Sequence, residues 1–443
     1  MGKRSAFTLV RPDCAGIDLG SREHFVAVPS DRGEPEVRSF GCFTVDLAAM
    51  GDWLLSLGIA DVAMEATGVY WMPVYEALAS RGLKVALVDG RAAKALPGRK
   101  SDVSDCQWIR DLHMHGLLRP CAVPDADILA LRSYWRQRGR LVSQRSEQIL
   151  LMQKALDQMN VQIHKVLTDL TGVSGMRILR AVLSGERDPK VLSSLLAARA
   201  KAKADLVEKA LEGSWSSHHL FALEEAMATY DFLGERLSVL DARLDEEMAK
   251  LGTGGSDGPP PGRKSKNDPD FDLRARVTDA LGVDPTTIDG IQAMTAATLL
   301  SEFGTDLSRF KSEKHFVSYL GLAPVNKITG GRIKSSRTKK VAHRASTALR
   351  VAANALHASA SALGAYLRRL KGRIGPAKAV TATARKLAIA YYRLVVHGQA
   401  YVDCGEEAYN RRFKEQRLKR LSKQAKTLGM RLVEATTDAS GFS

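Results

Sequence analysis

The sequence is poor in cysteine, and it lacks an apolar run long enough to span a membrane. Its 443 residues include five cysteines, which are odd in number, widely scattered and without a CxxC pair. This usage argues against a disulfide framework or a zinc knuckle and is typical of reduced thiols in a cytoplasm. The first 14 residues also lack the apolar core of a signal peptide. We therefore expect a cytoplasmic protein with no membrane partner.

Acidic residues are outnumbered by basic ones. Lysine and arginine together number 65 against 49 aspartates and glutamates, which gives a formal charge of +16. Such an excess favours a polyanionic partner, because phosphate contacts release condensed counterions. A basic protein without such a partner is the alternative, and the clustering of the basic residues disfavours it. The charge therefore indicates a DNA or RNA partner and a nucleoid-associated location.

The first quarter of the chain predicts an α/β domain. Two short apolar runs near residues 15–19 and 24–30 are separated by a polar turn, and a third run follows at 37–43, so three sequential strands are expected. Helical and strand patterns then alternate up to about residue 118. This is the element order of a ribonuclease-H-like domain, which we assign to residues 12–120.

The rest of the chain predicts helices. A long helix over 127–170 and a second over about 220–251 carry apolar residues at spacings of three and four, which predicts a coiled-coil arm over 121–251. The two helices can pair as an antiparallel hairpin or across a dimer, and ordinary bundle core is the alternative. Residues 252–270 are rich in glycine, proline and charge, as expected of a flexible linker. A mostly helical domain over 271–402 and a basic tail helix over 403–443 follow; this tail is expected to lie on nucleic acid, or to be a solvated helix without a partner.

Four acids in the α/β domain are the strongest candidates for a chemical site. Asp18 lies within an apolar strand, Glu65 ends another apolar run, and Asp102 and Asp105 lie three residues apart at the start of a helix. Gathering four carboxylates is costly unless a cation is present, and hard oxygen ligands suit Mg²⁺ or Mn²⁺. Two such ions activate the attacking oxygen and stabilise the leaving oxygen of a phosphodiester.

Each acid also has a simpler explanation. Glu65 is compatible with an edge strand facing water, and the helix dipole favours Asp102 and Asp105 in a first turn. The run GIDLGS also resembles a phosphate-wrapping turn of actin-like ATPases, but the glycine-rich loops expected further along such a chain are missing. Arg99 and Lys100 either bind the scissile phosphate or are surface charges. The occurrence of all four acids in order favours the metal site.

A second candidate site lies in the run ITGGRIKSSRTKK. It offers hydroxyls at Thr329, Ser335, Ser336 and Thr338 among cations, and a hydroxyl nucleophile needs a base or metal as well as cations to stabilise phosphate charge. Simple contact with backbone phosphates is the alternative, which composition alone favours. The candidate nucleic-acid-binding residues in this run and on the arm are Arg132, Arg136, Arg332, Lys334, Arg337, Lys339 and Lys340.

Four motifs in this order resemble the DEDD transposases of insertion sequences, the IS110 family. They are GIDLGSREH, MEATGVYW, KSDVSDCQW and, far downstream, GLAPVNKITGGRIKSSRTKKVAHRASTALRVAANAL. The resemblance covers nearly the whole chain and implies a RuvC-like N-terminal domain, a coiled-coil arm and a C-terminal transposase domain. It also implies site-specific DNA recombination guided by a structured bridge RNA, with Mg²⁺ held by the four acids. A covalent phosphoserine link and a composite active site in a synaptic tetramer built from dimers are implied as well.

The resemblance assigns the acids to Asp18, Glu65, Asp102 and Asp105, and the nucleophile to Thr329. Relatives commonly have a serine where this chain has Thr329, before Gly330 and Gly331. Threonine keeps the hydroxyl but is stiffer at χ1. We predict that Thr329 attacks DNA; attack by Ser335 or Ser336, and an inactive copy, are the alternatives.

The sequence thus predicts an RNA-guided, Mg²⁺-dependent DNA transposase that forms a covalent protein–DNA intermediate. Two other functions keep part of this pattern. A metal-dependent DNA junction nuclease needs the four acids but no covalent step. A catalytically inactive scaffold that binds RNA and DNA needs only the basic surfaces.

Overall fold

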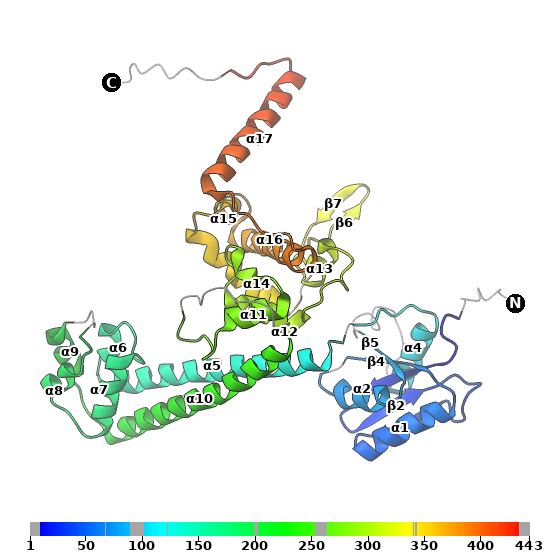
Figure 1. Ribbon diagram of the computed structural model, residues 1–443, viewed down its shortest axis with the longest axis horizontal. Helices are drawn as coiled ribbons and strands as arrows, with labels where there is room; N and C mark the ends of the chain where they lie inside the picture. The colour runs from blue at the N-terminus through cyan, green and yellow to red at the C-terminus, as the bar shows by residue number, and fades with distance from the viewer. Residues whose placement is uncertain are drawn as a thin grey trace. The chain divides into compact units, whose positions relative to one another are not determined.

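The computed structural model describes residues 9–66, 68–88, 102–121, 123–198, 203–252, 264–339, 341 and 343–433, without the side chains of residues 102 and 104. The chain divides into two compact units, Met1–Val123 and Pro124–Ser443 (Figure 1). The first is a mixed α/β unit and the second is mostly helical.

A five-stranded sheet in the order β3-β2-β1-β4-β5 forms the centre of the first unit. The strands are β1 (Cys14–Leu19), β2 (Glu23–Ala27), β3 (Val37–Gly41), β4 (Asp61–Glu65) and β5 (Lys84–Val88). The first three pair antiparallel, whereas β4 runs parallel to β1 and β5 parallel to β4. The three sequential strands and the alternation that follows them are therefore confirmed.

Helices cover both faces of this sheet. On one face, Ile17 of β1 packs in a buried cluster with Leu47 of α1 (Thr44–Ser56) and Val74 of α2 (Trp71–Ala79). On the other face lies α4 (Asp102–Met114). A Cβ atom at Gly16 would stand 2.3 Å from the backbone nitrogen of Arg110 and 2.3 Å from the carbonyl oxygen of Cys106. Glycine at position 16 therefore lets α4 lie directly against β1.

Replacing Gly16 by alanine should loosen α4 from the sheet. The new methyl group meets backbone atoms that have no rotamer to change, so we expect a destabilisation of about 1–3 kcal/mol. Cys106 on α4 is 0 % exposed, so its thiol reports this opening. We expect the G16A variant to show about tenfold faster labelling of Cys106 by a thiol reagent, located by mass spectrometry.

Gly139→Ala is the matched control. Gly139 lies within a long helix with nothing within 4 Å of its added Cβ, so alanine should be neutral or stabilise the helix by up to about 1 kcal/mol. Labelling of Cys106 at the wild-type rate in G16A would show that α4 does not depend on the close approach.

Two long helices, α5 (Ala126–Gln158) and α10 (Ser217–Lys250), pack along each other in the second unit. They run antiparallel, because Arg138 pairs with Asp241 while the later Arg145 lies over the earlier Tyr230. The expected helix over 127–170 was wrong in its extent. It ends at Gln158 and turns at Asn160, where φ is 55°.

Apolar residues at spacings of three and four continue beyond this turn without forming one helix. Ile163 and Val166 belong to the short α6 (Ile163–Val166), and Leu170 follows it. Ile163, Leu170 and Met152 still pack in one buried cluster. This cluster also includes residues of three further helices, α7 (Val173–Leu183), α8 (Pro189–Ser194) and α9 (Ala204–Leu211). The apolar spacing at this end of the arm therefore reflects which residues are buried and does not indicate one continuous helix.

Residues 264–270, in the second half of the expected linker, contact the two long helices. The buried guanidinium of Arg138 donates to both carboxylate oxygens of Asp241 and to the carbonyl oxygen of Asn267. The backbone N–H of Asp270 donates to the same carboxylate at 3.1 Å. These hydrogen bonds offset the cost of burying the ion pair and hold this segment to the arm. The first half, 253–263, lies outside the described residues.

The C-terminal part of the second unit is a helical body with one short hairpin. Its elements are α11 (Leu273–Leu281), η1 (Pro285–Thr287), α12 (Ala293–Phe303), α13 (Glu313–Tyr319), β6 (Lys327–Thr329), β7 (Arg332–Ser335), α14 (Arg344–Ala355), η2 (Leu356–Ala358), α15 (Ala362–Ile374), α16 (Pro376–His397) and α17 (Gly405–Thr427). Its core also includes Leu131 and Trp135 of α5, and Leu244 and Met248 of α10. None of the helices that the structure describes is long and apolar enough to cross a membrane.

Candidate functional site

Asp18 and Glu65 occupy equivalent positions on neighbouring parallel strands. Ile17 of β1 is paired with Met64 of β4, and each acid is the next residue along its strand. Because side chains alternate between faces, Asp18 lies on the same face as Gly16, two residues earlier. Glu65 lies on the same face as Ala63, which packs against Ile109 of α4. Both half-buried acids therefore lie on the face that α4 covers.

The first residues of α4 lie toward the same end of the sheet as these two acids. The Cys14 thiol, at the start of β1, donates to the carbonyl oxygen of Arg110. Further along β1, Gly16 lies against Cys106, one turn earlier in α4. The helix therefore runs opposite to β1, and its first residue, Asp102, begins one turn beyond Cys106 in the direction of Asp18.

The thiol of Cys106 interacts electrostatically with Asp18. Burial and, to a smaller extent, the negative charge of Asp18 together raise the pKa of Cys106 to about 12. The thiol also donates to the carbonyl oxygen of Val103 at 3.1 Å. Cys106 is therefore a neutral packing residue at physiological pH rather than a nucleophile. Sequence reasoning assigned no role to Cys106 or Gly16; the small residue inside an apolar strand was the available signal for close packing.

The other predicted site residues of this unit are either exposed or outside the described part of the structure. Asp105 is exposed on α4, one residue before the buried Cys106, and the side chain of Asp102 lies outside the described part, as do Arg99 and Lys100. Among the side chains that the structure describes, no three or more His, Cys, Asp or Glu residues come close enough to hold a metal ion. Asp18 and Glu65 both supply carboxylate oxygens on this face, the donor type that suits Mg²⁺ or Mn²⁺.

Thr329 lies at the tip of an exposed two-stranded hairpin. It ends β6 and is paired with Arg332, the first residue of β7. Between them, Gly330 and Gly331 have φ values of 56° and 72°, a left-handed turn that other residues adopt only with strain. Both strands are largely exposed, so the Thr329 hydroxyl is accessible to a large substrate.

A shallow groove of about 520 Å³ lies at the base of this hairpin, and cations dominate its lining. Ser335 lies in the groove and accepts from the backbone N–H of Arg337 at 3.4 Å. The lining residues are Val325, Lys327, Lys334, Ser335, Arg337, Thr338 and Lys339. The structure thus gathers three of the predicted nucleic-acid-binding cations around one groove, whereas Lys340 lies outside the described residues.

Arg132 and Arg136 both bind the helical body. Arg132 donates to the carbonyl oxygens of Ser301 and Glu302, and Arg136 forms two hydrogen bonds with the Glu302 carboxylate at 3.0 and 2.8 Å. These contacts hold α5 against α12. Sequence spacing placed both arginines on a helix but gave no sign of Glu302, which lies 170 residues after Arg132 and 166 after Arg136.

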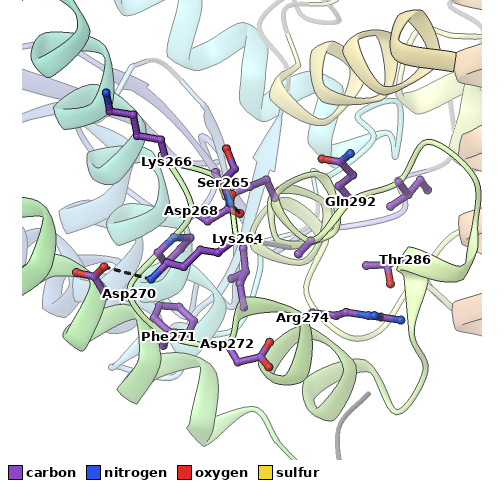
Figure 2. Close-up of a pocket in the computed structure, with 15 residues that line it drawn as sticks. Lys264, Ser265, Lys266, Asp268, Asp270, Phe271, Asp272, Arg274, Thr286 and Gln292 are labelled. Carbon is purple, nitrogen blue, oxygen red and sulfur yellow. Dashed lines mark hydrogen bonds and ion pairs between the residues drawn. The ribbon is translucent and has the colours of Figure 1, made fainter. Parts of the chain in front are cut away.

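A larger hollow of about 900 Å³ lies between the segment 264–274 and the start of α12 (Figure 2). Its cations already have acidic partners: Lys264 reaches Asp270, as Figure 2 shows, and Arg274 binds Asp284 at 2.6 Å. None of the predicted chemical residues lines it. Size alone therefore does not make this hollow a candidate site.

Comparison with known families gives two matches. Residues 15–161 match the DEDD domain of an IS110-type transposase, and residues 286–368 match a transposase of the IS116/IS110/IS902 family. The first range contains all four predicted acids, and the second contains the whole β6–β7 hairpin. A comparison with curated proteins found no match.

Proposed function

Because the chain belongs to the IS110 family of transposases, we propose that it recombines DNA under the guidance of a structured RNA, with divalent metal bound by its acids and a hydroxyl as nucleophile. The observation that carries this proposal is the matched position of Asp18 and Glu65 on adjacent parallel strands, inside the matched DEDD segment. Two carboxylates on one covered face of a sheet supply the hard oxygen ligands that a divalent cation prefers.

We further propose that residues 12–120 are a ribonuclease-H-like, RuvC-like catalytic domain. The strand order β3-β2-β1-β4-β5, with three antiparallel strands followed by two parallel ones, supports this interpretation. Asp18, Glu65, Asp102 and Asp105 would hold Mg²⁺ or Mn²⁺. Such ions, when bound, lower the pKa of an attacking oxygen and offset charge on the phosphate.

The strands that carry Asp18 and Glu65 set the geometry of this site. Asp18 is fixed by its strand, because Gly16 two residues earlier is pressed against the α4 backbone. Glu65 follows Met64, which is 0 % exposed in the core. Rigid strands therefore hold both carboxylates, and α4 covers the sheet beside them. Residues placed on such elements keep their orientation better than residues on loops.

Thr329 would supply the nucleophile. Its hydroxyl oxygen forms a bond to phosphorus, its proton passes to a base or to solvent, and a deoxyribose oxygen leaves and is protonated. The energy of the phosphodiester is kept in the protein–DNA ester, so reversal of the same step can rejoin DNA without another energy source. Arg332, paired with Thr329 across the turn, and Lys334 are close enough along the hairpin to offset phosphate charge.

The hairpin and the acids lie in different compact units of the chain. The resemblance implies a composite site in which one subunit supplies acids and another supplies the hydroxyl, within a dimer or synaptic tetramer. The formal charge of +16 and the cationic groove beside the hairpin support binding of a guide RNA as well as DNA.

The RNA-guided part of the proposal predicts a specific bound RNA. Protein purified from its host after treatment with DNase should carry one enriched structured RNA that maps beside its own gene, as measured by sequencing bound and total RNA. A sample from cells that express an unrelated protein of similar charge is the control. Bound RNA that simply mirrors the abundance of cellular RNAs would contradict guidance but not DNA recombination.

A further inference from the structure

The last helix, α17, lies beyond both segments that match known families, since the second match ends at residue 368. Its first turns are anchored to α15. The guanidinium of Arg369 lies 4.1 Å from the ring centroid of Phe413 and donates to the Tyr409 hydroxyl at 2.9 Å. Arg368 also pairs with Glu406 at 2.6 Å. These contacts fix where α17 begins and the direction in which it leaves α15.

Beyond this anchor the helix packs against nothing that the structure describes. No residue of α17 is buried, and Figure 1 shows its second half standing clear of α15 and α16. After its first turns, this 23-residue helix therefore gains little stability from packing against the rest of the described chain. Its outer turns are available to a partner.

The charge of α17 indicates the chemistry of that partner. Eight exposed cations lie on the helix, against a single acid, Glu415, after its first turn. Among the residues that the structure describes, none of the eight has an ion-pair partner. They are Arg411, Arg412, Lys414, Arg417, Lys419, Arg420, Lys423 and Lys426. A concentration of unpaired cations on one helix is costly in self-repulsion and is offset by a polyanion.

Four of these cations share one face. Arg412, Lys419, Lys423 and Lys426 follow spacings of seven, four and three, which place them in one row of about 21 Å along the helix, with Glu415 in the gap between Arg412 and Lys419. The exposed Leu418 and Leu421 lie on another face, three residues apart. We call the row Arg412, Lys419, Lys423 and Lys426 the α17 stripe.

We propose that the α17 stripe binds the phosphate backbone of duplex DNA. The inference rests only on the family assignment, which makes DNA the molecule acted on; it needs neither the guide RNA nor the covalent step. A straight helix of about 34 Å matches one turn of a regular duplex, and a row of cations along one of its faces suits a regular phosphate backbone. The irregular phosphates of a folded RNA suit such a straight row less well.

The stripe would hold DNA without reading its sequence. Lysine and arginine contacts to phosphate fix position and affinity, while base edges carry the sequence information. The anchor on α15 couples this contact to the helical body that carries the β6–β7 hairpin. DNA bound along α17 would therefore be kept at high local concentration near that body.

The test removes the four charges of the stripe from the full-length protein. The variant R412Q/K419Q/K423Q/K426Q should bind an arbitrary 30-base-pair duplex about tenfold or more weakly at 0.1 M salt. The slope of log affinity against log salt should fall in magnitude by about three to four, because each phosphate that the protein neutralises contributes roughly 0.9 to that slope. Fluorescence anisotropy over a series of salt concentrations measures both quantities.

The matched control removes four exposed cations from the far end of the arm, in K154Q/R177Q/K190Q/K209Q. Both variants carry a formal charge of +12 in place of +16, so any effect of net charge alone appears equally in both. The control should keep the wild-type slope. Equal slopes in the two variants, or loss of binding to a folded RNA or to anionic vesicles without loss of duplex binding, would overturn the proposal.

The same variant separates this inference from the proposed function. At a DNA concentration that saturates it, the stripe variant should still form the covalent adduct attributed to Thr329. If neither the wild type nor the stripe variant forms an adduct but the salt slope changes, the covalent step is refuted and the stripe is kept. If the variant forms the adduct with an unchanged salt slope, the stripe is refuted and the covalent step is kept.

Discussion

Replacing Asp18 or Glu65 by its amide should lower DNA cleavage by about a thousandfold or more, which is about 4 kcal/mol of lost transition-state stabilisation. The two carboxylates lie side by side on the face of the sheet that α4 covers. An amide keeps the shape of the side chain but removes its charge, so a divalent ion loses most of its affinity. Single-turnover cleavage of labelled DNA in Mg²⁺ and in Mn²⁺ measures the effect.

Asp52→Asn is the control for these variants. Asp52 is an exposed acid on α1, on the opposite face of the sheet, where it binds Arg81 at 2.9 Å. Its replacement should leave cleavage within about twofold, since exposed ion pairs contribute little. Full cleavage activity in both D18N and E65Q, in a preparation free of wild-type protein, would refute the metal-site interpretation and favour a non-enzymatic scaffold.

Replacing Thr329 by alanine should abolish the covalent protein–DNA adduct, with a loss of about a hundredfold or more. The hydroxyl is exposed beside a turn of two glycines, and the chain supplies no other hydroxyl at positions 327–334. Thr329→Ser should form the adduct faster than the wild type, because serine has fewer restrictions at χ1. Denaturing gels of protein incubated with labelled DNA reveal the adduct.

Ser335→Ala and Ser336→Ala test the alternative nucleophiles on the same hairpin. Both should keep the adduct if Thr329 attacks. Loss of the adduct in one of these and not in T329A would move the nucleophile to that serine. Cleavage without any adduct in the wild type would favour a junction nuclease with the four acids and no covalent step.

Much of the first unit could be predicted because its signals are local. Three short apolar runs with a polar turn predicted β1, β2 and β3. The apolar residues around Asp18 and before Glu65 placed both acids on strands. The family match over residues 15–161 agrees with the resemblance that the motifs had indicated. The start of α4 at Asp102 was also expected.

The rest depends on contacts between distant parts of the chain. Nothing near Arg136 in the sequence indicates that Glu302 binds it. Nothing near Arg138 indicates that it forms a buried ion pair with Asp241. The end of α5 at Gln158 was missed because apolar spacing continues through the turn at Asn160. Burial favours the same spacing whether or not the backbone stays helical.

The core of the C-terminal body has a consequence for dividing or exchanging parts of this protein. Leu131 and Trp135 enter that core from α5, and Leu244 and Met248 from α10. A fragment expressed from residue 271 onward would thus carry an uncovered apolar surface and a tendency to aggregate. A chimera with a relative must take the matching turns of both long helices along with the body, because the unit that folds is not one continuous stretch of sequence.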